Sequence, residues 1–87
     1  MSLISRFDGN MNVISKQMRM YRLKADISYE VLSAKLELLG ISIHKQSLYD
    51  IENNKRTVKD YELLGIAHIL GIDVNDLLKD MHKTLKK

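Results

Sequence analysis

The fold is decided by two short stretches, SYEVL at residues 28–32 and IHKQSLYDIENNKR at residues 43–56. Each predicts a short helix, because Ser28 can cap the first and apolar residues recur at helical spacing in the second. The apolar stripe of the second helix consists of Ile43, Leu48 and Ile51. Gly40 lies between the two stretches and can adopt the left-handed backbone that ends a helix. The pattern therefore predicts two helices joined by a tight turn, with most of the second helix polar and open to a partner.

The composition favours one small helical domain. The chain has 87 residues, no proline, no cysteine and only four glycines, and its apolar residues recur at helical periods. A domain of this size buries only about two-thirds of its unfolded surface, so it needs an efficient core. No apolar run approaches the roughly 20 residues of a membrane span, and the first residues lack a signal-peptide pattern. We expect an all-α five-helix bundle located in the cytoplasm.

Charge is unevenly distributed along the chain. Residues 79–87 contain four lysines and one aspartate, which accounts for the formal net charge of +3. Within the neutral remainder, residues 11–25 carry only basic charged side chains, whereas residues 60–78 carry four acids and no lysine or arginine. One part of the domain therefore suits phosphate groups and another part repels them.

Periodicity predicts five helices, over residues 11–25, 29–39, 45–53 and 59–70 and from residue 74 into the basic tail. Three parts of the chain are expected: a flexible N-terminal arm at residues 1–10, a helical domain at 11–80 and a basic tail at 81–87. The apolar residues expected in the core of the first, second and fourth helices are Ile14, Met18, Tyr21, Val31, Leu32, Leu36, Leu39, Leu63, Leu64, Ile66, Ala67 and Leu70.

Several of these features together resemble a known family. They are Arg22, Ile27-Ser28, the pattern Ile43-x-x-x-x-Leu48-x-x-Ile51-Glu52-Asn53, Lys55-Arg56, and residues 61–64 and 70–72. In order and spacing they resemble the Cro and phage-repressor class of regulators, the XRE family, across about residues 13–78. The second helix and its turn are about five residues longer than in the commonest arrangement, which resembles a long-turn subgroup.

The resemblance implies that the third helix enters the major groove of double-stranded DNA, with Lys45 and Gln46 as base contacts. Their chemistry suits guanine and adenine edges respectively, although both are also ordinary residues for a solvated helix. Tyr49 shares their face and is equally compatible with a base or phosphate contact and with packing on the core. Asp50 could accept a hydrogen bond from cytosine or act against wrong sequences, and it is also compatible with a lost DNA function.

The flanking polar residues suit the phosphate backbone. The expected phosphate contacts are Tyr29, Ser47, Asn53, Lys55 and Arg56. The alternative for residues 53–56 is a solvated turn. The resemblance further implies that Arg22 and Glu52 form a partly buried ion pair between the first and third helices.

Other chemistry is not indicated. The three histidines lack metal-ligand spacing, no cofactor motif is present, and no nucleophile elbow or phosphate loop suggests an enzyme. Asp73 and Asp76 are explained by capping of the last helix.

The last helix carries more apolar residues than one short helix needs. Leu77, Leu78, Met81 and Leu85 predict a homodimer interface, unless Met81 and Leu85 fold back on their own subunit or fray. The function predicted from the sequence is a transcriptional repressor that binds its operator as a dimer. The alternative is a protein-interaction module on the same scaffold, with an unknown protein partner and weak or no specific DNA binding.

Overall fold

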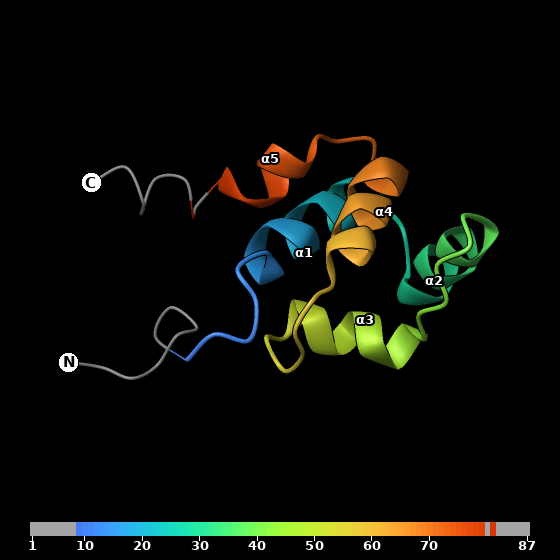
Figure 1. Ribbon diagram of the computed structural model, residues 1–87. Coiled ribbons are helices and arrows are strands. Elements are labelled where there is room, and N and C mark those ends of the chain that lie inside the picture. The colour runs from blue at the N-terminus through green and yellow to red at the C-terminus, as the bar shows by residue number, and fades with distance from the viewer. Residues whose placement is uncertain (1–8, 80, 82–87) are drawn as a thin grey trace.

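The structure, a computed structural model, describes residues 9–79 and residue 81. Its helices are α1 (Ser15–Lys24), α2 (Tyr29–Leu38), α3 (Lys45–Glu52), α4 (Asp60–Leu70) and α5 (Val74–Leu77). Figure 1 shows α1 between α5 on one side and α3 on the other. No strand occurs within the described ranges, and the predicted all-α five-helix fold is confirmed. Most of the predicted arm (residues 1–8) and of the predicted tail (residues 82–87) lies outside the described residues.

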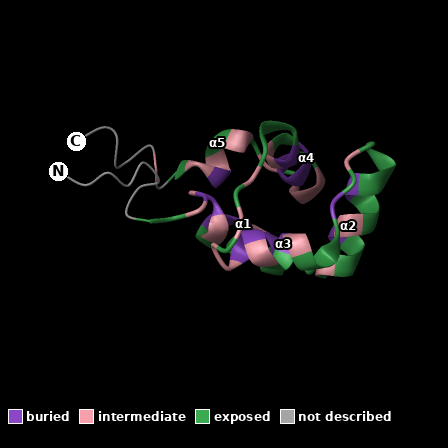
Figure 2. Ribbon diagram, turned by 60° about the horizontal axis from the view of Figure 1, so that its bottom comes forward, coloured by how far each residue is buried: buried purple, intermediate pink, exposed green. Residues whose placement is uncertain are grey.

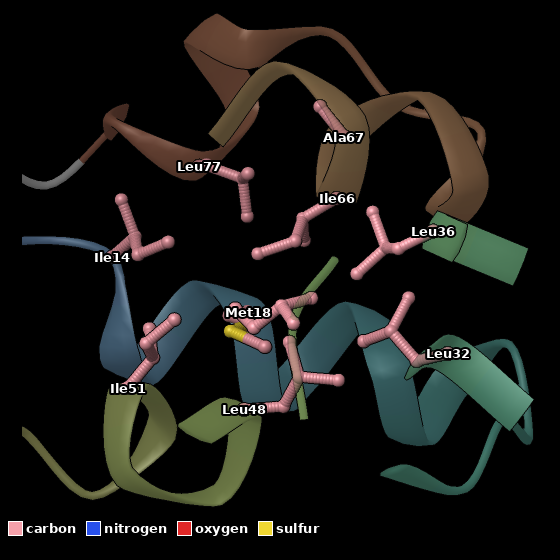
Figure 3. Packing of buried hydrophobic residues seen from close by; sticks show 10 residues of the cluster. Ile14, Met18, Leu32, Leu36, Leu48, Ile51, Ile66, Ala67 and Leu77 are labelled. Carbon is pink, nitrogen blue, oxygen red and sulfur yellow. The ribbon is translucent and has the colours of Figure 1, made fainter. Parts of the chain in front are cut away.

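All five helices contribute to one hydrophobic core. The side chains that are fully or almost fully buried in it are Ile14, Met18, Leu32, Leu36, Ile43, Leu48, Ile51, Ile66, Ala67 and Leu77. Figure 3 shows them converging from the different helices on one interior space. Because each buried aliphatic side chain contributes about 1.5–3 kcal/mol, this small set supplies much of the stability that fixes α3 against its neighbours.

The core contains fewer of the apolar residues than the sequence predicts. Val31, Leu39 and Leu64 were expected to be buried but are exposed, Leu64 by 62%. For Leu64 the physical reason is the close packing of α4 at Gly65, where an added Cβ would lie 2.4 Å from Cδ1 of Ile41 in the turn and 2.9 Å from Cδ2 of Leu36 in α2. With Gly65 in the contact, the adjacent Leu64 points away from it.

The first helix begins later than its apolar pattern predicts, at Ser15 instead of residue 11. Asn12 explains the difference, because its Oδ1 accepts hydrogen bonds from the N–H groups of Ile14 (2.9 Å) and Ser15 (3.0 Å). Its Nδ2 donates to the carbonyl oxygens of Ile51 and Arg56, each at 2.9 Å. This buried amide therefore caps the start of α1 and joins it to the end of α3.

A second asparagine holds the preceding segment in place. Asn54 has a left-handed backbone (φ 59°). Its Oδ1 accepts hydrogen bonds from the N–H groups of Met11 (2.7 Å) and Asn12 (3.1 Å), and its Nδ2 donates to Oδ1 of Asn10. The turn after α3 is thus bound to residues 10–12 instead of being only a solvated loop.

The connection between α2 and α3 spans residues 39–44 and is the turn expected from the sequence. Ser28 caps α2 by accepting a hydrogen bond from the N–H of Val31 at 3.1 Å. Gly40 adopts φ 84° just after the helix, in the region that glycine enters without steric cost. Ser33 Oγ then donates to the carbonyl oxygen of Ile43 at 2.7 Å, which fixes the far end of the turn.

One residue of the predicted dimer interface, Leu77 in α5, is not at the surface. Leu77 is fully buried in the core of its own chain, so its assignment to a surface between two copies is wrong. Leu78 is partly buried and packs against the same core, and Met81 is also partly buried. Leu85 lies outside the described residues.

Candidate nucleic-acid interface

The outward face of α3 and the start of α2 form an open groove. Its volume is about 310 Å³, and it is lined by Ser28, Tyr29, Glu30, Lys45, Gln46 and Tyr49. Along α3 the exposed and buried residues alternate at helical spacing, so one side faces the core and the other faces solvent (Figure 2). The solvent side begins with the first turn of the helix.

His44 caps this first turn. Its Nδ1 accepts a hydrogen bond from the N–H of Gln46 at 3.1 Å. The imidazole thus takes the place of the hydroxyl or carboxylate that usually caps a helix. The sequence did not predict that this histidine would accept a capping hydrogen bond.

The four predicted base contacts lie on one face, and two of them are engaged by carboxylates. Lys45 Nζ lies 3.6 Å from an exposed carboxylate oxygen of Glu30, across the groove. Gln46 Nε2 donates to Oδ1 of Asp50 at 3.1 Å, one helical turn away. Lys45, Gln46 and Tyr49 are exposed and Asp50 is half-buried. All four are therefore at the surface, with acids interleaved among the groups that suit base edges.

Tyr49 packs against another tyrosine instead of the core. Its ring meets the Tyr29 ring edge to face, with the centroids 5.9 Å apart and an angle of 78° between the planes. Lys55 Nζ lies 5.7 Å from the Tyr49 centroid. This contact brings Lys55, from the loop after α3, to the same surface as the groove.

A buried carboxylate joins α3 to α1 and α2. Glu52 Oε2 accepts a hydrogen bond from Arg22 Nε at 2.6 Å, and Oε1 accepts one from Arg22 Nη2 at 3.2 Å. The Tyr29 hydroxyl also donates to Oε1, at 2.8 Å, and Arg19 Nε lies 3.7 Å away. The structure thus brings together the two residues predicted to pair, and it adds two partners that the sequence did not predict.

The pKa values of Arg22 and Tyr29, which both donate hydrogen bonds to Glu52, are raised. The hydrogen bond to Glu52 raises the pKa of Arg22, whose guanidinium also lies 4.1 Å from the centroid of the Tyr29 ring. Burial raises the pKa of Tyr29, and its hydrogen bond to Glu52 raises it further. Tyr29 therefore stays protonated and directs its hydroxyl hydrogen inward, which leaves only an oxygen lone pair for other contacts.

Arg56, a predicted phosphate contact, has a partner that the sequence did not predict. Its Nη1 and Nη2 donate to the two carboxylate oxygens of Glu62 at 2.9 and 3.0 Å. Glu62 is buried, and the Arg56 side chain is only 28% exposed. The reason is structural, because Glu62 also accepts from the N–H of Lys59 at the start of α4 and needs a cation to compensate its buried charge.

This pairing lowers the proton affinity of the buried carboxyl. Burial raises the pKa of Glu62, but the hydrogen bonds from Arg56 and the Lys59 N–H lower it by more, so that it falls below its ordinary value of 4.5. The same interaction raises the pKa of Arg56. An arginine six residues before a glutamate was the only signal in the sequence, and it does not specify a contact.

The remaining predicted phosphate contacts occupy the edge of the surface. Asn53 Nδ2 donates to the carbonyl oxygen of Tyr49 at 2.8 Å and so closes the end of α3. Ser47 is half-buried in the first turn, and Lys55 is exposed. Among the ion pairs found in the described part of the chain, none involves Lys55. Lys55 is thus the cation at this surface best placed to meet an anion.

Two further properties concern all the residues that the structure describes. Over residues 9–79 and 81, no group of three or more histidine, cysteine, aspartate or glutamate side chains is arranged to hold a metal ion. In the same residues, no helix combines the length and the apolar character needed to cross a membrane.

The helices α2 and α3 meet across the turn at residues 39–44, and the polar face of α3 is exposed, which together define a helix-turn-helix domain. The chain matches the model of the helix-turn-helix family HTH_3 over residues 18–77, and it belongs to this family of Cro and repressor-type domains. The family indicates DNA binding and a role in transcription regulation, and its domains are typically not enzymes. Neither a curated protein nor a solved structure gave a match.

Replacing Glu52 with alanine is expected to lower the free energy of unfolding by about 3 kcal/mol, because it leaves the buried Arg22 guanidinium without its partner. Glu30→Ala is the matched control, since this glutamate is exposed and its ion pair with Lys45 contributes roughly 0–1 kcal/mol. Urea denaturation measures both variants. Equal midpoints for Glu52→Ala and wild type would contradict the structural role of the pair.

Acid should destabilise the protein partly through Glu62. Its folded pKa lies below the unfolded value of about 4.5, so the stabilisation is complete above that pH and is lost as the pH falls through the folded pKa. In Glu62→Gln this loss should be absent, and the stability should fall less steeply with acid below about pH 4.5. Thermal unfolding at several pH values measures the slope. Glu37→Gln, which removes an exposed carboxylate of α2, should retain the wild-type slope, and an equal change in both variants would refute the assignment.

Proposed function

We propose that this protein binds double-stranded DNA sequence-specifically as a transcriptional regulator, and that it represses by occupying an operator as a dimer. The observation that carries the proposal is the exposed polar first turn of α3, which the buried Arg22–Glu52 pair holds in a fixed orientation. Membership of the HTH_3 family supports it. The connection at residues 39–44 supports assignment to the long-turn subgroup. Action on DNA is expected in the cytoplasm.

In this proposal the start of α3 enters the major groove. Lys45 exchanges its exposed contact with Glu30 for a guanine edge, and Gln46 contacts adenine. Lys55 approaches a phosphate beside Tyr49, while Ser47 and Asn53 add polar contacts at the edges. An exposed ion pair is weak in water, so releasing Lys45 from Glu30 opposes binding only slightly.

The arrangement of charge also favours a second candidate, a protein-interaction module on this scaffold. Carboxylates accompany most cations near α3, since Lys45 lies beside Glu30, Arg19 lies near Glu52, and Arg56 is bound to Glu62. A surface for DNA alone is usually more strongly positive. A protein partner that contributes both charges would tolerate this mixture.

The proposed dimer uses the surface at the end of α5. Leu78 and Met81 are both partly exposed there, and Leu85 follows at helical spacing in the sequence. A two-fold pair of domains presents two copies of α3, which suits half-sites about one DNA turn, roughly 34 Å, apart.

Fluorescence anisotropy tests the DNA function. Wild type is expected to bind a duplex from upstream of its own gene more tightly than a scrambled duplex, and to lose affinity as salt increases. Gln46→Ala should weaken specific binding by about tenfold and leave the weak binding to the scrambled duplex unchanged. His68→Ala, an exposed change on α4, should bind as wild type does. Equal weak binding to both duplexes, unaffected by Gln46→Ala, would favour the protein-interaction module.

Sedimentation equilibrium tests the dimer. Wild type is expected to have the mass of two chains, and Met81→Lys the mass of one, because the substitution places a charge in the proposed apolar contact. Leu64→Lys, which alters an exposed leucine of α4, should remain dimeric. A wild-type monomer, or a dimeric Met81→Lys protein, would remove this interface from the proposal.

A further inference from the structure

Gln46 and Asp50 form a hydrogen-bonded pair on the exposed face of α3. They are four residues apart, and Gln46 Nε2 donates to Asp50 Oδ1 at 3.1 Å. An ionised carboxylate can only accept hydrogen bonds, so the glutamine must turn its NH2 group, and not its oxygen, toward Asp50. The chemistry of the pair therefore decides the orientation of the amide.

This orientation limits what Gln46 can offer to a base. A free glutamine amide has two N–H donors and one oxygen acceptor, but after donation to Asp50 it has one donor and one acceptor left. Adenine presents one acceptor (N7) and one donor (N6–H) in the major groove. Guanine presents two acceptors there, N7 and O6. The engaged amide thus matches adenine, whereas a free amide could satisfy guanine with its two N–H groups.

We propose that Asp50 is a positioning residue that makes Gln46 select adenine over guanine. Asp50 acts through Gln46 and needs no contact of its own with a base. This inference rests on the proposed function, because it concerns how the same surface reads DNA. It also gives a role to a carboxylate whose charge repels phosphates.

The surrounding cations are placed so that Asp50 stays available to Gln46. Arg56 interacts electrostatically with Asp50, but its hydrogen bonds go to both carboxylate oxygens of Glu62. Lys45 lies beside Glu30 across the groove, and Lys55 Nζ lies over the Tyr49 ring. In water an exposed pair of this kind is only a weak preference. Exclusion of water by DNA strengthens it, since a carboxylate without a donor is costly in a dry interface.

The experiment selects binding sites from a randomised duplex library with wild type, Gln46→Ala and Asp50→Ala. The base position whose preference disappears in Gln46→Ala is the one that Gln46 reads. Anisotropy with two duplexes that differ only there, A·T against G·C, then gives the discrimination ratio. We expect about tenfold or more in wild type and about threefold or less in Asp50→Ala.

A matched control separates positioning from charge. Glu30→Gln removes a negative charge from the same surface without touching the Gln46–Asp50 bond. It should strengthen binding to both duplexes while leaving the ratio unchanged, whereas Asp50→Ala should strengthen binding and reduce the ratio. Both side chains are at the surface, and circular dichroism should show that each variant keeps its helices.

The outcomes are distinguishable. If wild type enriches no sequence, the proposed function fails and the inference fails with it. If wild type enriches a site but Asp50→Ala keeps the full preference for adenine, only the inference is overturned. A wild-type preference for guanine or a pyrimidine at the Gln46 position would also overturn the inference alone.

Discussion

Three helices share one buried carboxylate, that of Glu52, and the position of α3 depends on it. Burying a charge is costly unless it is paired and hydrogen-bonded, so the carboxylate requires Arg22 from α1 and the Tyr29 hydroxyl from α2 to stay in place. Apolar packing beneath α3 would tolerate small rotations, because dispersion and the hydrophobic effect have little directionality. The hydrogen bonds to Glu52 do not, and they therefore fix the direction in which the first turn of α3 faces.

The same C-terminal end of α3 is also held by polar groups of a different kind. Asn12 donates to the carbonyl oxygens of Ile51 and Arg56, and Asn54 accepts from the chain before α1. Arg56 in turn binds the buried carboxylate of Glu62 in α4. No buried side-chain nitrogen or oxygen lacks a partner in the described part of the chain. A small domain with a modest core thus gains orientation from satisfied polar contacts as well as from buried area.

The outer face of α3 combines cations, amides and carboxylates. This mixture suits discrimination between DNA sequences better than strong attraction to every duplex. A dense positive surface would raise affinity for every duplex, because the phosphate backbone dominates nonspecific binding. Acids such as Asp50 and Glu30 reduce that general attraction. They also restrict the donors that Gln46 and Lys45 can offer. In the proposed function, the contrast between right and wrong sequences grows at the expense of total affinity.

The sequence by itself determined the helices and their order, because helix periodicity, Ser28 as a cap and Gly40 as a terminator act over a few residues. It also led to the Arg22–Glu52 pair, although through resemblance instead of spacing. Only the tertiary structure decided that Arg56 binds Glu62, that Leu77 is buried and that α1 starts at Ser15. These depend on which side chains meet across helices that are distant in sequence, and local patterns do not contain that information. A buried carboxylate such as that of Glu62 pairs with a cation that lies near it in space, and the sequence motif that contains this cation does not reveal the pairing.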